Sequence, residues 1–210
     1  STMDFAMQKA ISEGILEEEN WNTGLIKIYE NLANDFYYSD PKSLLIFNDN
    51  HDMSRIYTQM KEDVSKTKMA VSLMLTLPRI PQILYGTEIL MEDSAKPGDH
   101  GLIRTDFPGG WKNDKSNAFT GENLEDSQLE MQNYLKTLLN FRKNSKAIHE
   151  GETLHYAPKD GIYLLSRKYK DEIVIYIVNK NNESVNSDTD RFIEINACLL
   201  YTSDAADDQA

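Results

Sequence analysis

Apolar positions in the first 150 residues alternate between short continuous runs and helical spacing. The runs at 43–48 and 83–85 are short and bounded by turn residues, which is typical of buried strands. Residues 25–36 repeat apolar side chains every three or four positions, and residues 61–77 are apolar through their last two turns, so both predict helices. This alternation of strands and helices predicts a parallel α/β sheet with right-handed crossovers.

Two further helices extend this pattern at its ends. The triplet Met3-Asp4-Phe5 predicts the end of a strand that leads into a helix over 6–13, with Asp4 in a structural role. A long loop over 92–123, rich in Gly, Asp and Pro, precedes an amphipathic helix centred on residues 129–141. We therefore expect the α/β part to end near residue 147.

After residue 150 the pattern changes to β-branched and aromatic clusters between turn signals, which predicts a small antiparallel β module. Its expected strands cover 151–157, 161–169, 172–179 and 191–195. The resulting domain division is 1–147 for the α/β part, 148–196 for the β module and 197–210 for a tail. The tail does not continue the β pattern and looks like translated adaptor sequence, so we expect it to be non-native or disordered.

The composition removes several functional classes. The 34 carboxylates exceed the 22 Lys and Arg and give a formal charge of −12, whereas nucleic-acid binding usually requires a basic face. The single cysteine, Cys198, allows neither an intramolecular disulfide nor a thiolate metal cluster. The longest apolar run is too short to span a membrane, and the first residues do not resemble a signal peptide. An uncharged sugar polymer remains compatible with this surface.

The strand predicted at 43–48 turns abruptly polar and continues as Asn50-His51-Asp52. In a parallel α/β barrel, catalytic side chains lie at the carboxyl ends of the strands. An isolated His-Asp pair would more simply cap the strand and open a turn. Arg55, three residues further on, is expected to support this loop through an ion pair.

The run Phe47 to Asp52 fits the pattern Phe-x-x-Asn-His-Asp and resembles the fourth signature region of the α-amylase family, glycoside hydrolase family thirteen. The resemblance implies the C-terminal part of a TIM (β/α)8 barrel, about strands six to eight, followed by a small antiparallel β domain. It also implies that Asp52 is the carboxylate that stabilises the transition state and that His51 binds sugar hydroxyls.

Two downstream motifs support the same resemblance. The run around Tyr85 and Glu88 is similar to the family's eighth strand, and the segment 98–111 resembles the neopullulanase and cyclomaltodextrinase branch. By resemblance, Asp99 and Arg104 contact sugars beyond the cleaved unit. The simpler alternatives are packing roles for Tyr85 and Glu88 and a pair between Arg104 and a barrel carboxylate. Phe107 and Trp111 offer flat faces for sugar rings, although we expect Trp111 to pack.

The family's nucleophile and proton donor lie upstream of these motifs, and this chain begins too late to contain them. The expectation is therefore a fragment of a retaining hydrolase for α-1,4-glucosidic bonds of starch-derived or cyclic maltooligosaccharides. Because a retaining mechanism needs both carboxyl groups, we expect no hydrolysis by this polypeptide alone. Unpaired barrel edges further suggest that its amino-terminal half aggregates or stays partly molten.

Two alternatives stay open: a non-catalytic carbohydrate-binding module and a transporter-associated relative with the same fold. No cofactor is expected in this fragment, and the resemblance leaves calcium open for a longer parent protein. The expected partner is an α-glucan oligosaccharide, without nucleic acid or a membrane span, and the oligomeric state is undetermined. A periplasmic or extracellular location is expected for the parent, and a cytoplasmic one stays open.

Overall fold

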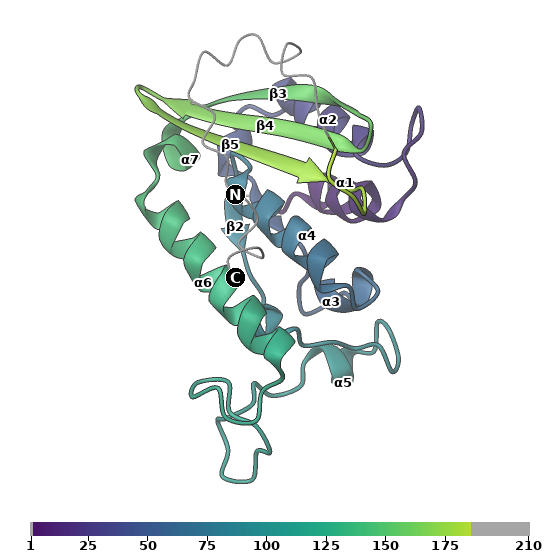
Figure 1. Ribbon diagram of the computed structural model, residues 1–210, viewed down its shortest axis with the longest axis vertical. Helices are drawn as coiled ribbons and strands as arrows, with labels where there is room; N and C mark the ends of the chain where they lie inside the picture. The colour runs from purple at the N-terminus through teal and green to yellow at the C-terminus, as the bar shows by residue number, and fades with distance from the viewer. Residues whose placement is uncertain (1, 186–210) are drawn as a thin grey trace.

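The computed structural model describes residues 2–185 (Figure 1). The strand predicted at 191–195 and the tail at 197–210 lie outside these residues. Within the described part, an α/β unit carries a three-stranded antiparallel sheet on one side (Figure 1). No helix there has the length and apolar composition that crossing a bilayer demands.

Three neighbouring parallel segments form the sheet of the α/β unit. Strand β1 (Leu45–Phe47) pairs in parallel with β2 (Ile80–Gln82), and Met3 forms a parallel bridge to Leu45. Helix α1 (Phe5–Leu16) follows Met3, and helices α3 (Ile56–Gln59) and α4 (Val64–Thr76) connect β1 to β2. Each parallel segment is thus followed along the chain by helical structure, which is the repeat of a (β/α)8 barrel.

The strand predicted at 83–85 is displaced by three residues in the structure. The paired residues are Ile80 to Gln82, and the amide of Ile80 donates to the carbonyl of Leu44. The run Ile83-Leu84-Tyr85 instead enters a turn at Gly86, whose φ of +86° suits glycine. Pro81 lies inside the true strand, where its missing N–H misled the prediction.

The first two helices pack against each other and against α4. Asp4 caps α1 by accepting a hydrogen bond from the Met7 amide at 3.0 Å, so its predicted structural role is confirmed. Helix α2 (Ile26–Ala33) ends earlier than predicted and continues as a short 3-10 turn, η1 (Asn34–Tyr37). Phe36, expected on its buried face, is 73% exposed, so that part of the prediction is wrong.

The second half of the chain begins with the long helix α6 (Asp126–Asn144), as predicted, and a short helix α7 (Lys146–Glu150). The sheet order β3-β4-β5 is antiparallel and confirms the three described strands of the β module. Its strands are β3 (Glu152–Lys159), β4 (Ile162–Tyr169) and β5 (Glu172–Asn179). Asp160 and Lys170 adopt positive φ at the two hairpin turns.

One hydrophobic cluster joins the sheet to the helices. Tyr163, Leu165 and Val178 of the sheet are buried together with residues of α1 and α4. The hydroxyl of Tyr176 lies 2.6 Å from Ser72 Oγ on α4 and donates to the Met69 carbonyl at 3.1 Å. The inner face of the sheet is therefore part of the main core.

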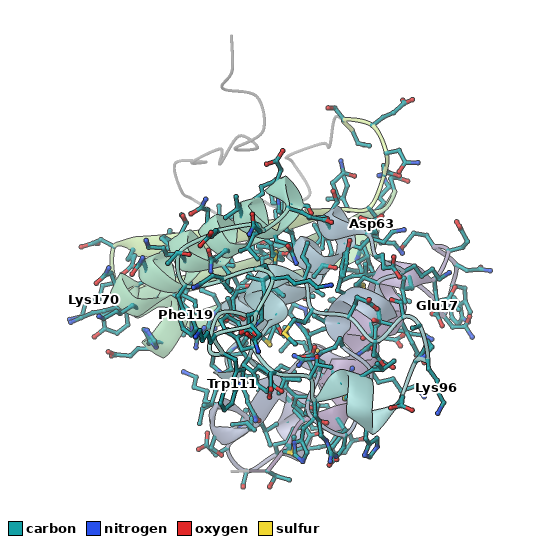
Figure 2. The ribbon with its side chains drawn as sticks, turned by 90° about the horizontal axis from the view of Figure 1, so that it is seen from below. Glu17, Asp63, Lys96, Trp111, Phe119 and Lys170 are labelled. Atoms are coloured by element: carbon teal, nitrogen blue, oxygen red, sulfur yellow. The ribbon has the colours of Figure 1, made fainter. Side chains whose placement is uncertain are left out.

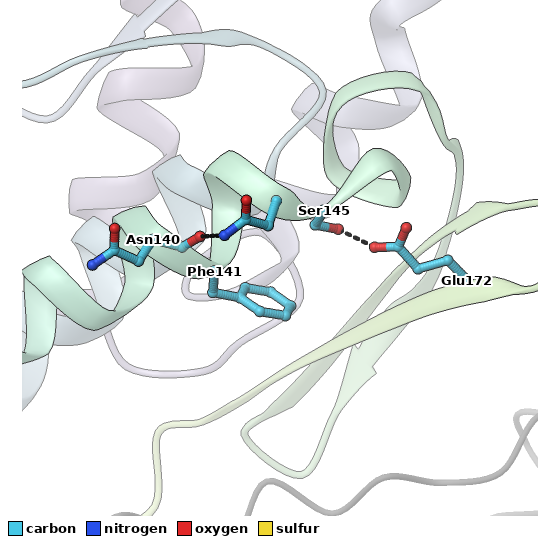
Figure 3. Close-up of a pocket in the computed structure, with 5 residues that line it drawn as sticks. Asn140, Phe141, Ser145 and Glu172 are labelled. Carbon is cyan, nitrogen blue, oxygen red and sulfur yellow. Dashed lines mark hydrogen bonds between the residues drawn. The ribbon is translucent and has the colours of Figure 1, made fainter.

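Polar contacts reinforce this junction. Figure 3 shows Ser145, between α6 and α7, hydrogen bonded to Glu172 on β5, beside a surface hollow that also includes Phe141. Arg142 donates to the carbonyls of Leu75 and Arg79, and Arg167 donates to the carbonyls of Thr76 and Gly151. Among these acceptors, the carbonyls of Leu75 and Thr76 belong to the last turn of α4. Carbonyls in the last turn of a helix have no amide partner within the helix, so the two buried guanidinium groups supply the missing donors.

Candidate functional site

Strand β1 ends at Phe47, and the signature residues follow in a tight polar turn. The Asp52 amide donates to Asn50 Oδ1 at 2.8 Å, which closes the turn locally. His51 Nε2 lies 3.2 Å from Asp52 Oδ2, and both side chains are largely exposed. The turn therefore presents an imidazole and a carboxylate together at the carboxyl end of the strand.

Arg104 joins this pair from a distant part of the chain. Its Nη2 donates to Asp52 Oδ1 at 2.6 Å, and its Nε donates to the His51 carbonyl at 2.8 Å. The same Nη2 lies 3.0 Å from His100 Nδ1. The structure thus brings together three of the four predicted site residues. The alternative for Arg104 was an ion pair with a barrel carboxylate, and the carboxylate that it pairs with is Asp52 itself.

Asp99 occupies a different position. It caps the single-turn helix α5 (His100–Ile103) by accepting from the amides of Gly101 and Leu102. Its other oxygen pairs with Lys96 Nζ at 2.7 Å, and this contact lowers the pKa of the Asp99 carboxyl. Asp99 therefore orients the helix that precedes Arg104, and its contact with substrate stays a prediction.

Arg55 follows Asp52 by three residues and is fully buried. Its Nε donates to the Ile103 carbonyl at 2.9 Å, one of its Nη atoms donates to the Tyr85 carbonyl, and its guanidinium lies 4.9 Å from the centre of the Tyr85 ring. The expected supporting role is confirmed, although carbonyls and an aromatic ring replace the expected ion pair as side-chain partners. Arg55 ties the Asp52 turn to the segment that carries Arg104.

Two carboxylates that the sequence patterns did not single out fix the same turn. Asp49 is buried and accepts a hydrogen bond from the Ile56 amide at 2.7 Å. Burial raises the pKa of Asp49 to about 6. Asp93 accepts from the amides of Arg55 at 3.0 Å and Gly98 at 2.7 Å. No local signal reveals these roles, because the partners are main-chain amides that only the fold brings close.

The loop after Arg104 exposes its aromatic side chains. Trp111 is 67% exposed, so the expectation that it packs is wrong. Asp114 fixes this part of the loop by accepting from the amides of Gly109 and Trp111 at 2.7 and 3.0 Å. Figure 2 places Trp111 and Phe119 on one flank of the lower face and Lys96 on the opposite flank.

Clusters of the side chains that most often bind metals were sought in the part of the chain that the structure describes. No group of three or more His, Cys, Asp or Glu residues converges there at metal-binding distance.

Comparison with known proteins identifies the family to which the chain with this site belongs. The family described as "Alpha amylase, catalytic domain" matches residues 1–137, and the family described as "Cyclo-malto-dextrinase C-terminal domain" matches residues 153–206. The chain belongs to the α-amylase family. Its predicted fold class is thereby confirmed as part of the family's barrel followed by an antiparallel β domain.

Individual relatives agree with this assignment. The cyclomaltodextrin glucanotransferase of Paenibacillus macerans is 24% identical over 86% of this chain and 22% of its own length. The maltogenic alpha-amylase of Bacillus acidopullulyticus is 27% identical over 79% of this chain and 27% of its own length. This member of the α-amylase family thus spans about a quarter of the length of these curated relatives.

A solved structure shows the same fold. The alpha-amylase from Geobacillus thermoleovorans, complexed with acarbose, superposes with a TM-score of 0.66 at 24% identity and covers 86% of this chain and 37% of that one. At this identity the likeness establishes the fold of the α-amylase family member and nothing beyond it.

Proposed function

We propose that this chain provides part of the sugar-cleaving site of a retaining α-glucan hydrolase that acts on α-1,4-glucosidic bonds. The substrates would be starch-derived or cyclic maltooligosaccharides. The observation that carries the proposal is the convergence of Arg104, Asp52 and His51 at the end of β1 in a member of the α-amylase family.

The roles follow from the chemistry of the three groups. Arg104 engages Asp52 Oδ1, which fixes the carboxylate and leaves its exposed face available to sugar hydroxyls. In this role Asp52 stabilises the positive charge of an oxocarbenium-like transition state. The imidazole of His51, 66% exposed, donates to a hydroxyl of the sugar unit whose bond is cleaved. Asp99 and Arg104 bind the neighbouring sugar unit.

Asp52 cannot complete the reaction alone. Retention of configuration requires a nucleophile and a separate acid/base about 5 Å apart, on either side of the scissile bond. Asp52 is assigned neither role, so a longer protein that contains this chain would supply both. On this basis the 210-residue polypeptide itself is expected to be inactive.

Two observations weigh against a binding module carried by the β domain alone. Such a module needs aromatic side chains arrayed on an open face of the sheet, yet Tyr163 is fully buried. Tyr176 is engaged with Ser72 and Met69 of α4. Neither tyrosine is free to stack on a sugar.

The decisive experiment uses a longer protein that includes residues 1–185 of this chain. Hydrolysis of a chromogenic maltoside is measured for the wild type and for Asp52→Asn. Because the lost charge acts on the transition state, we expect kcat to fall about 100-fold or more. Asp171→Asn, in the exposed turn between β4 and β5, is the matched control and should leave kcat within about threefold of wild type. Equal activity of Asp52→Asn and wild type would contradict the proposal.

A further inference from the structure

His100 contacts the Asp52–Arg104 site and has no role in the function proposed above. It is the first residue of the single-turn helix α5, and Arg104 follows the last residue of that turn. Residues four apart on a helix lie on the same face, so the imidazole and the guanidinium come together. His100 Nδ1 lies 3.0 Å from Arg104 Nη2, and both residues are exposed.

The chemistry of the two groups determines which nitrogen of His100 carries the proton. A guanidinium has only N–H donors and keeps its charge in proteins, so Nη2 must donate in this contact. His100 Nδ1 must therefore accept, which requires a free lone pair on that nitrogen. The contact consequently selects the neutral imidazole with its proton on Nε2. A doubly protonated imidazole has no acceptor and would meet Arg104 as a second cation.

His100 is the third of three acceptors around the Arg104 guanidinium. Nε donates to the His51 carbonyl at 2.8 Å, and Nη2 also donates to Asp52 Oδ1 at 2.6 Å. Both hydrogens of Nη2 and the hydrogen of Nε are therefore used inside the protein. Within residues 2–185, Nη1 donates to no protein acceptor, which leaves its two N–H groups for a ligand.

The backbone of α5 is held without the His100 side chain. Asp99 caps the first amides of the turn. At the other end, the carbonyl of the buried Ile103 accepts from Arg55. The exposed imidazole is therefore not needed to form the turn. In the described part of the chain its side-chain hydrogen bond is to Arg104.

We propose that His100 is a positioning residue whose neutral imidazole holds the Arg104 guanidinium in place against Asp52. Its use in sugar binding rests on the proposed function, which assigns Asp52 and Arg104 to that task. The site is then assembled when His100 is neutral and loosened when the imidazole gains a second proton. Histidine is the side chain whose charge commonly changes between about pH 5 and 8, so this dependence is open to measurement.

The charged neighbours of His100 oppose that second proton. They come from α5, from the loop before it and from the turn after β1, and they are Arg104, Lys96, Asp99, His51 and Asp52. Lys96 and Asp99 pair with each other at 2.7 Å. Arg104, a permanent cation, is the group that the imidazole contacts directly. Protonation of His100 therefore sets two positive charges against each other.

The test observes the Arg104 side chain directly, by nitrogen-15 NMR of the 210-residue chain. His100→Ala removes the acceptor, whereas His100→Asn keeps an acceptor oxygen in the place of Nδ1. His149→Ala is the matched control, because His149 is an exposed histidine on α7, distant from the site along the chain. Far-UV circular dichroism verifies that each variant is folded.

At about pH 8, we expect Nδ1 of His100 to be unprotonated in wild type. Arg104 should show separate Nη1 and Nη2 signals, because fixed hydrogen bonds slow the rotation of the guanidinium. His100→Ala should merge these signals, and His100→Asn and His149→Ala should keep them apart. Lowering the pH to about 5 should merge them in wild type and leave His100→Asn unchanged. A proton on Nδ1 at the higher pH, merged signals in wild type there, or separate signals in His100→Ala would overturn the proposal.

A kinetic measurement gives a second, independent readout on the longer protein used to test the proposed function. At about pH 8, His100→Ala should lower kcat/KM for maltoheptaose about five-fold or more, and His100→Asn should recover most of this loss. At about pH 5 wild type has itself lost the contact, so the difference between wild type and His100→Ala should shrink. A difference that is the same at both pH values would contradict the role of the neutral imidazole.

These outcomes are separate from those that decide the proposed function. Hydrolysis lost in Asp52→Asn, together with separate Arg104 signals in His100→Ala, would retain the function and reject the role of His100. Hydrolysis unaffected by Asp52→Asn, together with merged signals in His100→Ala, would reject the function and keep His100 as the residue that positions Arg104.

Discussion

Arg104 donates to Asp52 at 2.6 Å although 52 residues separate them along the chain. Both side chains are largely exposed, at 44% and 60%, so solvent screens their attraction. A contact of this geometry contributes little to folding. Its placement at the end of a barrel strand instead suits a group that must be held in position for a ligand.

The first prediction separates these two contributions. Asp52→Asn should lower the free energy of unfolding by less than about 1 kcal/mol, because exposed ion pairs contribute little. The same change should weaken maltose binding, because the carboxylate that accepts sugar hydroxyls is lost. Urea denaturation and calorimetric titration measure the two effects. A large loss of stability with intact binding would assign Asp52 a structural role.

The second prediction concerns Asp49. Its pKa is about 6 in the fold against an ordinary 3.8, so the folded state binds the proton more tightly than the unfolded state. The stability that this proton provides is fully present below pH 3.8 and is lost as pH rises through about 6.

Asp49→Asn provides the comparison because the amide oxygen can still accept from the Ile56 amide. Between pH 4 and 7, wild type should lose up to about 3 kcal/mol of unfolding free energy relative to Asp49→Asn. Chemical denaturation at several pH values measures the difference. A difference that is independent of pH would show that Asp49 does not titrate in this window.

The third prediction concerns the buried pair of Arg79 and Asp4, with Nε and Oδ2 3.0 Å apart. Arg79→Met leaves the Asp4 carboxylate, 1% exposed, without a cation and should destabilise the fold by about 3–5 kcal/mol. The double variant with Asp4→Asn should recover part of this loss, because asparagine still caps α1. Thermal and urea unfolding test both variants. A double variant less stable than Arg79→Met would contradict the explanation.

The fourth prediction concerns Arg55, which bridges the Asp52 turn to the carbonyls of Tyr85 and Ile103. Arg55→Lys keeps the charge but cannot reach both carbonyls with one ammonium group. Hydrogen exchange should therefore speed up for amides 98–104, and maltose affinity should fall. Unchanged protection of 98–104 in Arg55→Lys would mean that the loop does not depend on Arg55. Lys115→Arg, on the exposed loop, should alter neither quantity.

Local sequence signals predicted the parts of the fold that local chemistry determines. The buried run before Asn50-His51-Asp52 gave β1, and helical spacing gave α6. Turn residues such as Asp160 gave the hairpins, because tight hairpin turns require the positive φ that such residues adopt. The resemblance brought Asp52 and Arg104 to one site, which spacing alone does not do.

The prediction errors arise where contacts between distant parts of the chain decide the structure. Strand β2 includes Pro81 rather than the more β-prone Ile83, because the Ile80 amide pairs with Leu44 across the sheet. Asp93 supports the site through amides of Arg55 and Gly98, and sequence spacing does not encode such contacts.

The hydroxyl of Tyr176, bound to Ser72 and Met69, has a consequence for recombination between relatives. Two family descriptions meet between residues 137 and 153, which invites exchange of the terminal sheet as a cassette. The inner face of the sheet and the facing side of α4 are nevertheless complementary to each other. A chimera that inherits the strands without the corresponding helix face would leave a phenol without its acceptor and a misfit in the interior.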